Sequence, residues 1–112
     1  MDLKLDYLNE IAGGDTEFIN EILETYLNEI PKDMQILHQA ITSKDLSKVQ
    51  KIAHKMKSSF RLLGLSDLHD ASLNLENAAK QEIADWINHQ KSLDFIQTQV
   101  NTSLVLVKKT IQ

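Results

Sequence analysis

The chain has 112 residues, of which 42% are hydrophobic, so we expect residues 1–112 to form one domain with a modest core. The lack of cysteine excludes disulfides and thiolate metal sites, and the formal net charge of −4 argues against a nucleic-acid partner. No apolar run approaches the roughly 20 residues of a membrane span, and the N-terminus lacks the basic and apolar regions of a secretory signal. We therefore expect a cytoplasmic chain without membrane contact.

The beginning of the chain predicts a short helix and the start of a longer one. Three glycines and one proline in the whole sequence are few helix breakers, which favours an all-α fold. The short helix is expected to stop at Gly13 and Gly14, with Asp15 as the N-cap of the next helix. The apolar positions of the short helix are Leu3, Leu8 and Ile11.

A long amphipathic helix is predicted next. Its inward stripe recurs every three or four residues at Ile19, Leu23, Leu27, Ile30, Met34, Leu37 and Ile41. Pro31 lies inside this stripe, where a proline removes one backbone donor and clashes with the preceding turn. We therefore expect a kink near Ile30 rather than two separate helices.

Residues 42–45, with the sequence TSKD, predict a capped turn into a third helix. The stripe of that helix is Leu46, Val49, Ala53, Met56, Phe60 and Leu63. Gly64 follows where helices commonly end in a left-handed residue, and Ser66 is expected to cap a fourth helix. The stripe of the fourth helix is Leu68, Ala71, Leu75 and Ala78.

The last segment predicts one more long helix, which starts between Asp85 and Ser92. Its stripe is Trp86, Leu93, Ile96, Val100, Leu104, Val107 and Ile111. Four long helices joined by short connections predict an antiparallel up-down-up-down four-helix bundle. The short N-terminal helix is expected to cover one end of it.

His54 is the main candidate functional residue. It lies roughly 140° from the middle of the apolar stripe of the third helix, so we expect its imidazole to face water. The residues predicted on the same side are Gln50, Lys57, Ser58 and Arg61. Residues 44–61 hold six of the twelve basic side chains and one acidic side chain. Such a cationic surface suits a group that holds a phosphoryl dianion, and a solvated lysine-rich face is the open alternative.

The segment around His54 resembles a known family signature. Ala53-His54-x-x-Lys57-Ser58-Ser59, then Leu63-Gly64, Leu68 and Leu75-Glu76, are similar to the signature of histidine-containing phosphotransfer (HPt) domains of bacterial phosphorelays. The GGD at residues 13–15, the following helix with its proline, and the helix with Asp45 and Leu46 also resemble that family. The likeness covers roughly residues 3–80, whereas the final helix matches only in type.

The resemblance implies a phosphocarrier rather than an enzyme in the ordinary sense. His54 would accept a phosphoryl group from the aspartate of one receiver domain and pass it to the aspartate of another. Lys57 would help neutralise the phosphate, while Arg61 and Gln50 would support docking or the phosphate. Ser58 stands where the family usually has glycine, so it adds a hydroxymethyl group on the side where a receiver approaches.

The partners and cofactors follow from the same resemblance. We expect receiver domains of a hybrid sensor histidine kinase or of a response regulator as partners, and a monomeric chain that is either free-standing or a domain of a membrane-anchored kinase. No cofactor is expected on this chain, which lacks a Gly-rich ATP loop, and Mg²⁺ is expected on the receiver. His38, His69 and His89 have no metal-ligand spacing. The alternative function is an adaptor bundle that binds a protein partner without phosphate chemistry.

Overall fold

The computed structural model describes residues 1–111, in which every regular element is a helix. These are α1 (Asp6–Ala12), α2 (Thr16–Thr42), α3 (Leu46–Leu62), α4 (Ser66–Lys80) and α5 (Trp86–Thr110). Pro31 lies inside a continuous α2, so the predicted single helix is confirmed, and the kink near Ile30 stays a prediction. The last helix begins at Trp86, within the expected interval. None of these helices is long and apolar enough to cross a bilayer.

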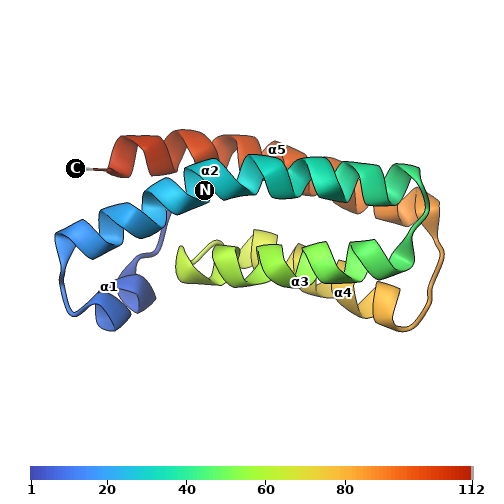
Figure 1. Ribbon diagram of the computed structural model, residues 1–112, viewed down its shortest axis with the longest axis horizontal. Coiled ribbons are helices and arrows are strands. Elements are labelled where there is room, and N and C mark those ends of the chain that lie inside the picture. Colours follow the sequence, from blue (N-terminus) through green and yellow to red (C-terminus); the bar gives the residue numbers. More distant parts are fainter. Residues whose placement is uncertain (112) are drawn as a thin grey trace.

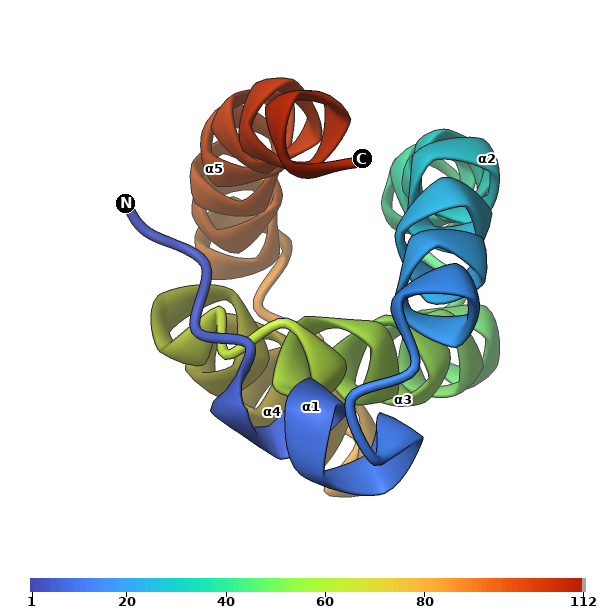
Figure 2. The same ribbon diagram turned by 90° about the vertical axis from the view of Figure 1, so that its left-hand side faces the viewer.

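Helices α2 to α5 form a four-helix bundle in which each helix packs against the next one along the chain. The ring closes where α5 packs against α2, and the end-on view shows α1 below one end of α3 and α4 (Figure 2). Consecutive helices run in opposite directions (Figure 1). The predicted all-α bundle with a short N-terminal helix is therefore confirmed.

Aspartates start three of the helices. The side chain of Asp15 accepts a hydrogen bond from the backbone N–H of Phe18, and Asp45 and Asp85 do the same at the starts of α3 and α5. Each carboxylate satisfies a backbone donor that has no partner within the helix. The predicted cap at Ser66 is wrong, because the N-cap of α4 is Leu65, whose side chain cannot accept a hydrogen bond.

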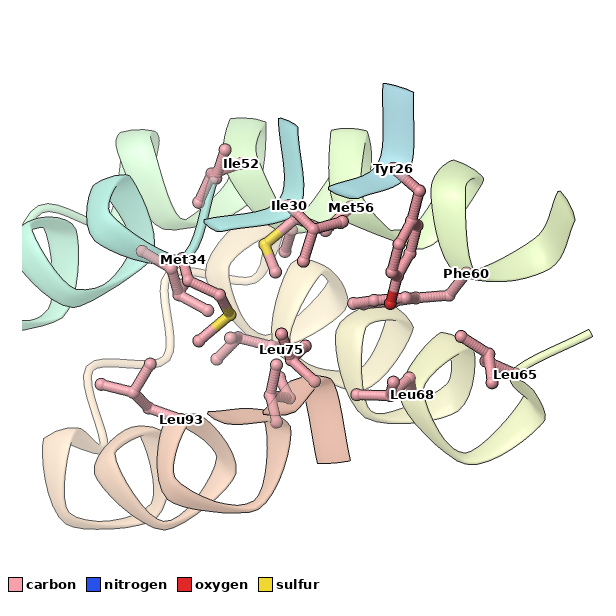
Figure 3. Close-up of a cluster of buried hydrophobic side chains, with 14 of the residues drawn as sticks. Tyr26, Ile30, Met34, Ile52, Met56, Phe60, Leu65, Leu68, Leu75 and Leu93 are labelled. Carbon is pink, nitrogen blue, oxygen red and sulfur yellow. The ribbon is translucent and has the colours of Figure 1, made fainter. Parts of the chain in front are cut away.

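The apolar stripes of the four long helices meet in one core. Within this core the rings of Tyr26 and Phe60 pack edge to face, with centroids 6.4 Å apart, and Leu68 lies beside Phe60 (Figure 3). The short helix contributes Leu8, which is fully buried. Ile11, predicted on the same stripe, is half exposed, because α1 has only two turns and presents one edge to the bundle.

The segment before α1 crosses the turn between α3 and α4. Leu3, predicted as helical, precedes α1 and packs against the core from this segment. The backbone N–H of Lys4 donates to the carbonyl of Leu63. Gly64 has a φ of +65°, and a Cβ there would lie 2.5 Å from the Lys4 carbonyl oxygen. Gly64 is therefore required both by its left-handed backbone and by the close approach of this segment.

Candidate functional site

The His54 side chain projects from the middle of α3 and is 65% exposed. Its neighbours Ala53 and Met56 point into the core, and the helical period places His54 on the outer side of the same turn. The predicted exposure of the imidazole is therefore confirmed. An exposed ring of this kind is accessible to a second protein.

One ring nitrogen of His54 bonds to a buried carboxylate from the neighbouring helix. Nδ1 lies 2.6 Å from Oε2 of Glu76 on α4, and the Glu76 side chain is only 2% exposed. This bond fixes the rotation of the ring about its side-chain bonds. It also connects the exposed imidazole to the rigid interior of the α3–α4 pair.

Glu76 is shared with lysine side chains. Nζ of Lys57 donates to Oε1 of Glu76 at 2.7 Å, and Nζ of Lys80 lies 3.8 Å from Oε2. Burial alone would raise the pKa of Glu76, but the hydrogen bonds from Lys57 and His54 and the charges of those groups outweigh it, so its pKa lies below the ordinary value. Glu76 is therefore a carboxylate at neutral pH.

The ionised Glu76 determines the tautomer of His54. A carboxylate can only accept a hydrogen bond, so Nδ1 of a neutral His54 must carry the proton. Nε2 then holds the lone pair, and no hydrogen bond to Nε2 occurs within residues 1–111. The free nitrogen on an exposed ring is the one available as a nucleophile.

Lys57 is less exposed than its position on the helix suggests. Its side chain is 21% exposed and its ammonium bonds to Glu76, so Lys57 is not a freely solvated cation. The cause is that α4 packs closely against this side of α3. Lys57 and His54 do lie on the same side, as predicted, and their common partner is Glu76.

The other predicted site residues surround His54 without bonding to it. Ser58 is exposed one turn after His54, and Gln50 is half-buried one turn before it. The guanidinium of Arg61 lies 5.4 Å from the centre of the Tyr7 ring of α1, in cation–π geometry. Arg61 therefore connects α1 to the exposed side of α3.

A second ion-pair cluster lies on the α2 side of α3. Nζ of Lys55 is 2.8 Å from Oδ1 of the buried Asp33 and 3.5 Å from Oε2 of Glu29. The hydrogen bond that Lys55 donates to Asp33 is the main cause that raises the pKa of Lys55, and the partial burial of Lys55 opposes this. Lys55 is thus a fixed cation between α2 and α3.

The remaining histidines are separate from this site. His38 bonds to Gln97 of α5, His69 to Asp70, and the buried His89 to the carbonyl of Ile83. Within residues 1–111 no group of three or more His, Cys, Asp or Glu side chains could hold a metal ion.

The sequence analysis names Glu76 only as part of the family signature and does not predict its contact with His54. One signal was present. The α4 stripe includes Leu75, and the buried face of α4 also holds Ser72, Glu76 and Ala79, so a carboxylate occupies an inward position. A buried carboxylate needs cationic or hydrogen-bonding partners, and the basic α3 precedes α4 in the chain.

Comparisons with known proteins find similarities in sequence and in fold. A family model described as the Hpt domain matches residues 21–104. No curated protein sequence matches the chain. The crystal structure of histidine-containing phosphotransfer protein B (HptB) from Pseudomonas aeruginosa PAO1 is similar in fold, with a TM-score of 0.84 and 17% sequence identity. The alignment covers 96% of this chain and 91% of that chain.

Proposed function

Because this chain belongs to the Hpt domain family, and is thus a phosphocarrier of a phosphorelay, we propose that Nε2 of His54 is the atom that carries the phosphoryl group. The observation that supports this atom is the 2.6 Å contact between Nδ1 and Glu76. It leaves Nε2 unprotonated on an exposed ring, which is the state that a nucleophilic imidazole needs at neutral pH.

The transfer step requires no proton to leave His54. Nε2 attacks the phosphorus of an aspartyl phosphate on a receiver domain, the N–P bond forms, and the P–O bond to the aspartate breaks. The ring gains positive charge during this step. Glu76, which accepts the hydrogen bond from Nδ1–H, stabilises that charge. The reverse step, with the aspartate of a second receiver as nucleophile, restores neutral His54.

The surrounding cations have different proposed roles. Lys57 keeps Glu76 ionised through its 2.7 Å bond and contributes positive charge close to the phosphoryl group. Arg61 and Gln50 support the docked partner at the two ends of the exposed side. Ser58 is the small residue beneath the receiver, where its hydroxymethyl group adds little bulk.

The partner supplies what this chain does not offer. We propose that Mg²⁺ and the reacting carboxylate belong to the receiver, because phosphoryl transfer needs charge neutralisation as well as alignment. The chain takes its phosphoryl group from a receiver and has no ATP site of its own. The receivers belong to a hybrid sensor kinase, a response regulator or both, and the chain acts as a monomer in the cytoplasm.

Transfer from a phosphorylated receiver to His54→Gln tests this function. The receiver domain is charged with acetyl phosphate and Mg²⁺, and wild type and variant are incubated with it. Wild type should accept the phosphoryl group and His54→Gln should not, whereas His38→Gln, a control at another exposed histidine, should accept it at the wild-type rate. Equal labelling of wild type and His54→Gln would show that His54 is not the carrier and would favour an adaptor role.

A further inference from the structure

A hollow of about 380 Å³ lies between α2 and α3, beside the exposed side that carries His54. Its lining residues are Ile36, Gln39, Lys48, Lys51, Ile52 and Lys55. Ile36 is 44% exposed at the surface, and Ile52 is buried. The hollow therefore combines an apolar wall with a group of lysines.

The lysines of this hollow differ in whether they have an ion-pair partner. Lys48 and Lys51 are exposed, and neither has an ion-pair partner within residues 1–111. The buried Asp33 on the α2 side is already paired with Lys55 at 2.8 Å. Two cations thus remain available to an anionic partner.

The other side of His54, towards α4, offers fewer free cations, because the exposed Arg61 lies over the ring of Tyr7. Lys57 and Lys80 are directed at Glu76, and the exposed side chains at the start of α4 include Asp67 and Asp70. An anionic protein surface would be repelled there and attracted towards α2. The charge around His54 is therefore asymmetric.

The hollow is continuous with the His54 site. Lys51 precedes His54 by three residues, so the two side chains are neighbours on successive turns of α3. A protein that brings its reactive group to Nε2 of His54 therefore also covers Lys51. The hollow beyond Lys51 falls within the footprint of a partner that extends towards α2.

We propose that the receiver docks over His54 towards α2, with acidic side chains beside its phosphorylated aspartate on Lys48 and Lys51 and an apolar side chain against Ile36. The inference rests on the proposed function and adds the orientation of the partner. A receiver suits the surface because its reacting aspartate and Mg²⁺-binding carboxylates make that face anionic. Complementary charge gives such a complex its association rate and its register.

The test compares charge reversal in the hollow with the same change elsewhere. Lys48→Glu/Lys51→Glu is matched by Lys91→Glu/Lys108→Glu, whose lysines are exposed on α5, and Ile36→Ser is matched by Val105→Ser on α5. The probe is a purified receiver domain charged with acetyl phosphate and Mg²⁺, selected as the one that transfers fastest to wild type. Thermal melting confirms that each variant is folded.

Lys48→Glu/Lys51→Glu should lower the second-order rate of transfer by roughly ten- to a hundredfold and weaken its dependence on salt. Ile36→Ser should lower the rate by roughly three- to tenfold, and both α5 controls should transfer like wild type. Phosphoramidate, a small phosphodonor, should label His54 equally in all of these variants, because it needs no docking surface.

Three results would overturn the proposal. Transfer to Lys48→Glu/Lys51→Glu at the rate of the α5 control would show that the receiver does not cover the hollow, while leaving the role of His54 intact. If sedimentation shows that wild type is a dimer and that this variant is a monomer, the hollow is the interface with a second copy of the chain. If no receiver transfers a phosphoryl group to wild type, the proposed function is wrong, and so is this inference.

Discussion

At the scale of single residues, Glu76 is the group on which the site depends. It is buried, ionised and shared by the ring of His54 and the ammonium of Lys57. Glu76→Gln keeps the shape and an oxygen that can accept a hydrogen bond from Nδ1–H, but it removes the negative charge. Transfer from a phosphorylated receiver should slow by roughly ten- to a hundredfold in this variant. An unchanged rate would show that the charge of Glu76 has no part in the transfer.

The pH dependence of stability provides a second check on Glu76. Its pKa lies below the ordinary value of 4.5 in the folded chain, so the unfolded chain binds this proton first as the pH falls. The stabilisation is thus present above pH 4.5 and is lost as the pH falls through the folded pKa. In urea unfolding, the free energy of unfolding of wild type should exceed that of Glu76→Gln most near neutral pH, and this difference should shrink below pH 4.5. A gap independent of pH would contradict the shift.

Lys57 and Lys80 form a matched pair of lysines on the same carboxylate. Lys57 is mostly buried and bonds to Glu76 at 2.7 Å, whereas Lys80 is half exposed at 3.8 Å. Lys57→Ala should lower the free energy of unfolding by about 1–3 kcal/mol, because it leaves a buried carboxylate with fewer donors. Lys80→Ala should cost less than about 0.5 kcal/mol. Equal losses in urea unfolding would mean that Lys57 is no more structural than a surface cation.

The sequence could predict His54 but not its bond to Glu76, and the reason is physical. The exposure of His54 follows from its angle on α3, which is a local property of the helix. Its contact with Glu76 joins residues 22 positions apart and depends on how α4 is rotated against α3. The partial burial of Lys57 has the same origin.

At the scale of the elements, two helix ends contain strained residues. Lys44 after α2 and Glu82 after α4 have φ values of 55° and 57°, in the left-handed region that costs a non-glycine residue about 1 kcal/mol. In both turns the next backbone N–H bonds back to the last helical turn, as in Asp45 to Ala40 and Ile83 to Ala78. This pattern is the Schellman motif, in which glycine is preferred.

Glu82→Gly should therefore raise the free energy of unfolding by about 0.5–1 kcal/mol. The neighbouring Gln81 has a φ of −83°, so Gln81→Gly is a matched control that relieves no strain and should lower stability by about 0.5 kcal/mol. Chemical denaturation of the three proteins distinguishes these signs. A loss of stability in both glycine variants would show that the left-handed residue is not strained.

The helix boundaries show where local sequence signals suffice. Asp15 and Asp45 were predictable as caps because their carboxylates act on their own helices. Ser66 was a reasonable cap by residue type, yet the hydrogen bonds of Leu65 and Ser66 back to Phe60 and Gly64 bring the chain into α4 one residue earlier. That geometry depends on the turn as a whole.

At the scale of the whole molecule, the bundle is closed by contacts between the first and last long helices. The hydroxyl of Tyr26 on α2 bonds to Ser103 on α5, which donates in turn to the carbonyl of Val100. His38 and Gln97 make a second, exposed bond between the same helices. The amphipathic stripes predicted a bundle, but only the packed structure identifies these pairs, because the partners are 59 and 77 residues apart.

The Tyr26 contact makes the closure of the bundle sensitive to alkaline pH. Burial raises the pKa of Tyr26 from 10.0 to about 12, and the bond to Ser103 opposes this only in part. Above pH 10.0 the unfolded chain ionises while the folded chain does not, so stability is lost at about 1.4 kcal/mol per pH unit until the folded pKa is reached. Tyr26→Phe should cost about 1 kcal/mol near neutral pH and lack this loss. In urea unfolding, the free energy of unfolding of Tyr26→Phe should therefore match or exceed that of wild type by pH about 11. The exposed-ring control Tyr7→Phe should show no such crossover. If wild type stays more stable than Tyr26→Phe at every pH, the hydroxyl is accessible to water in the folded bundle.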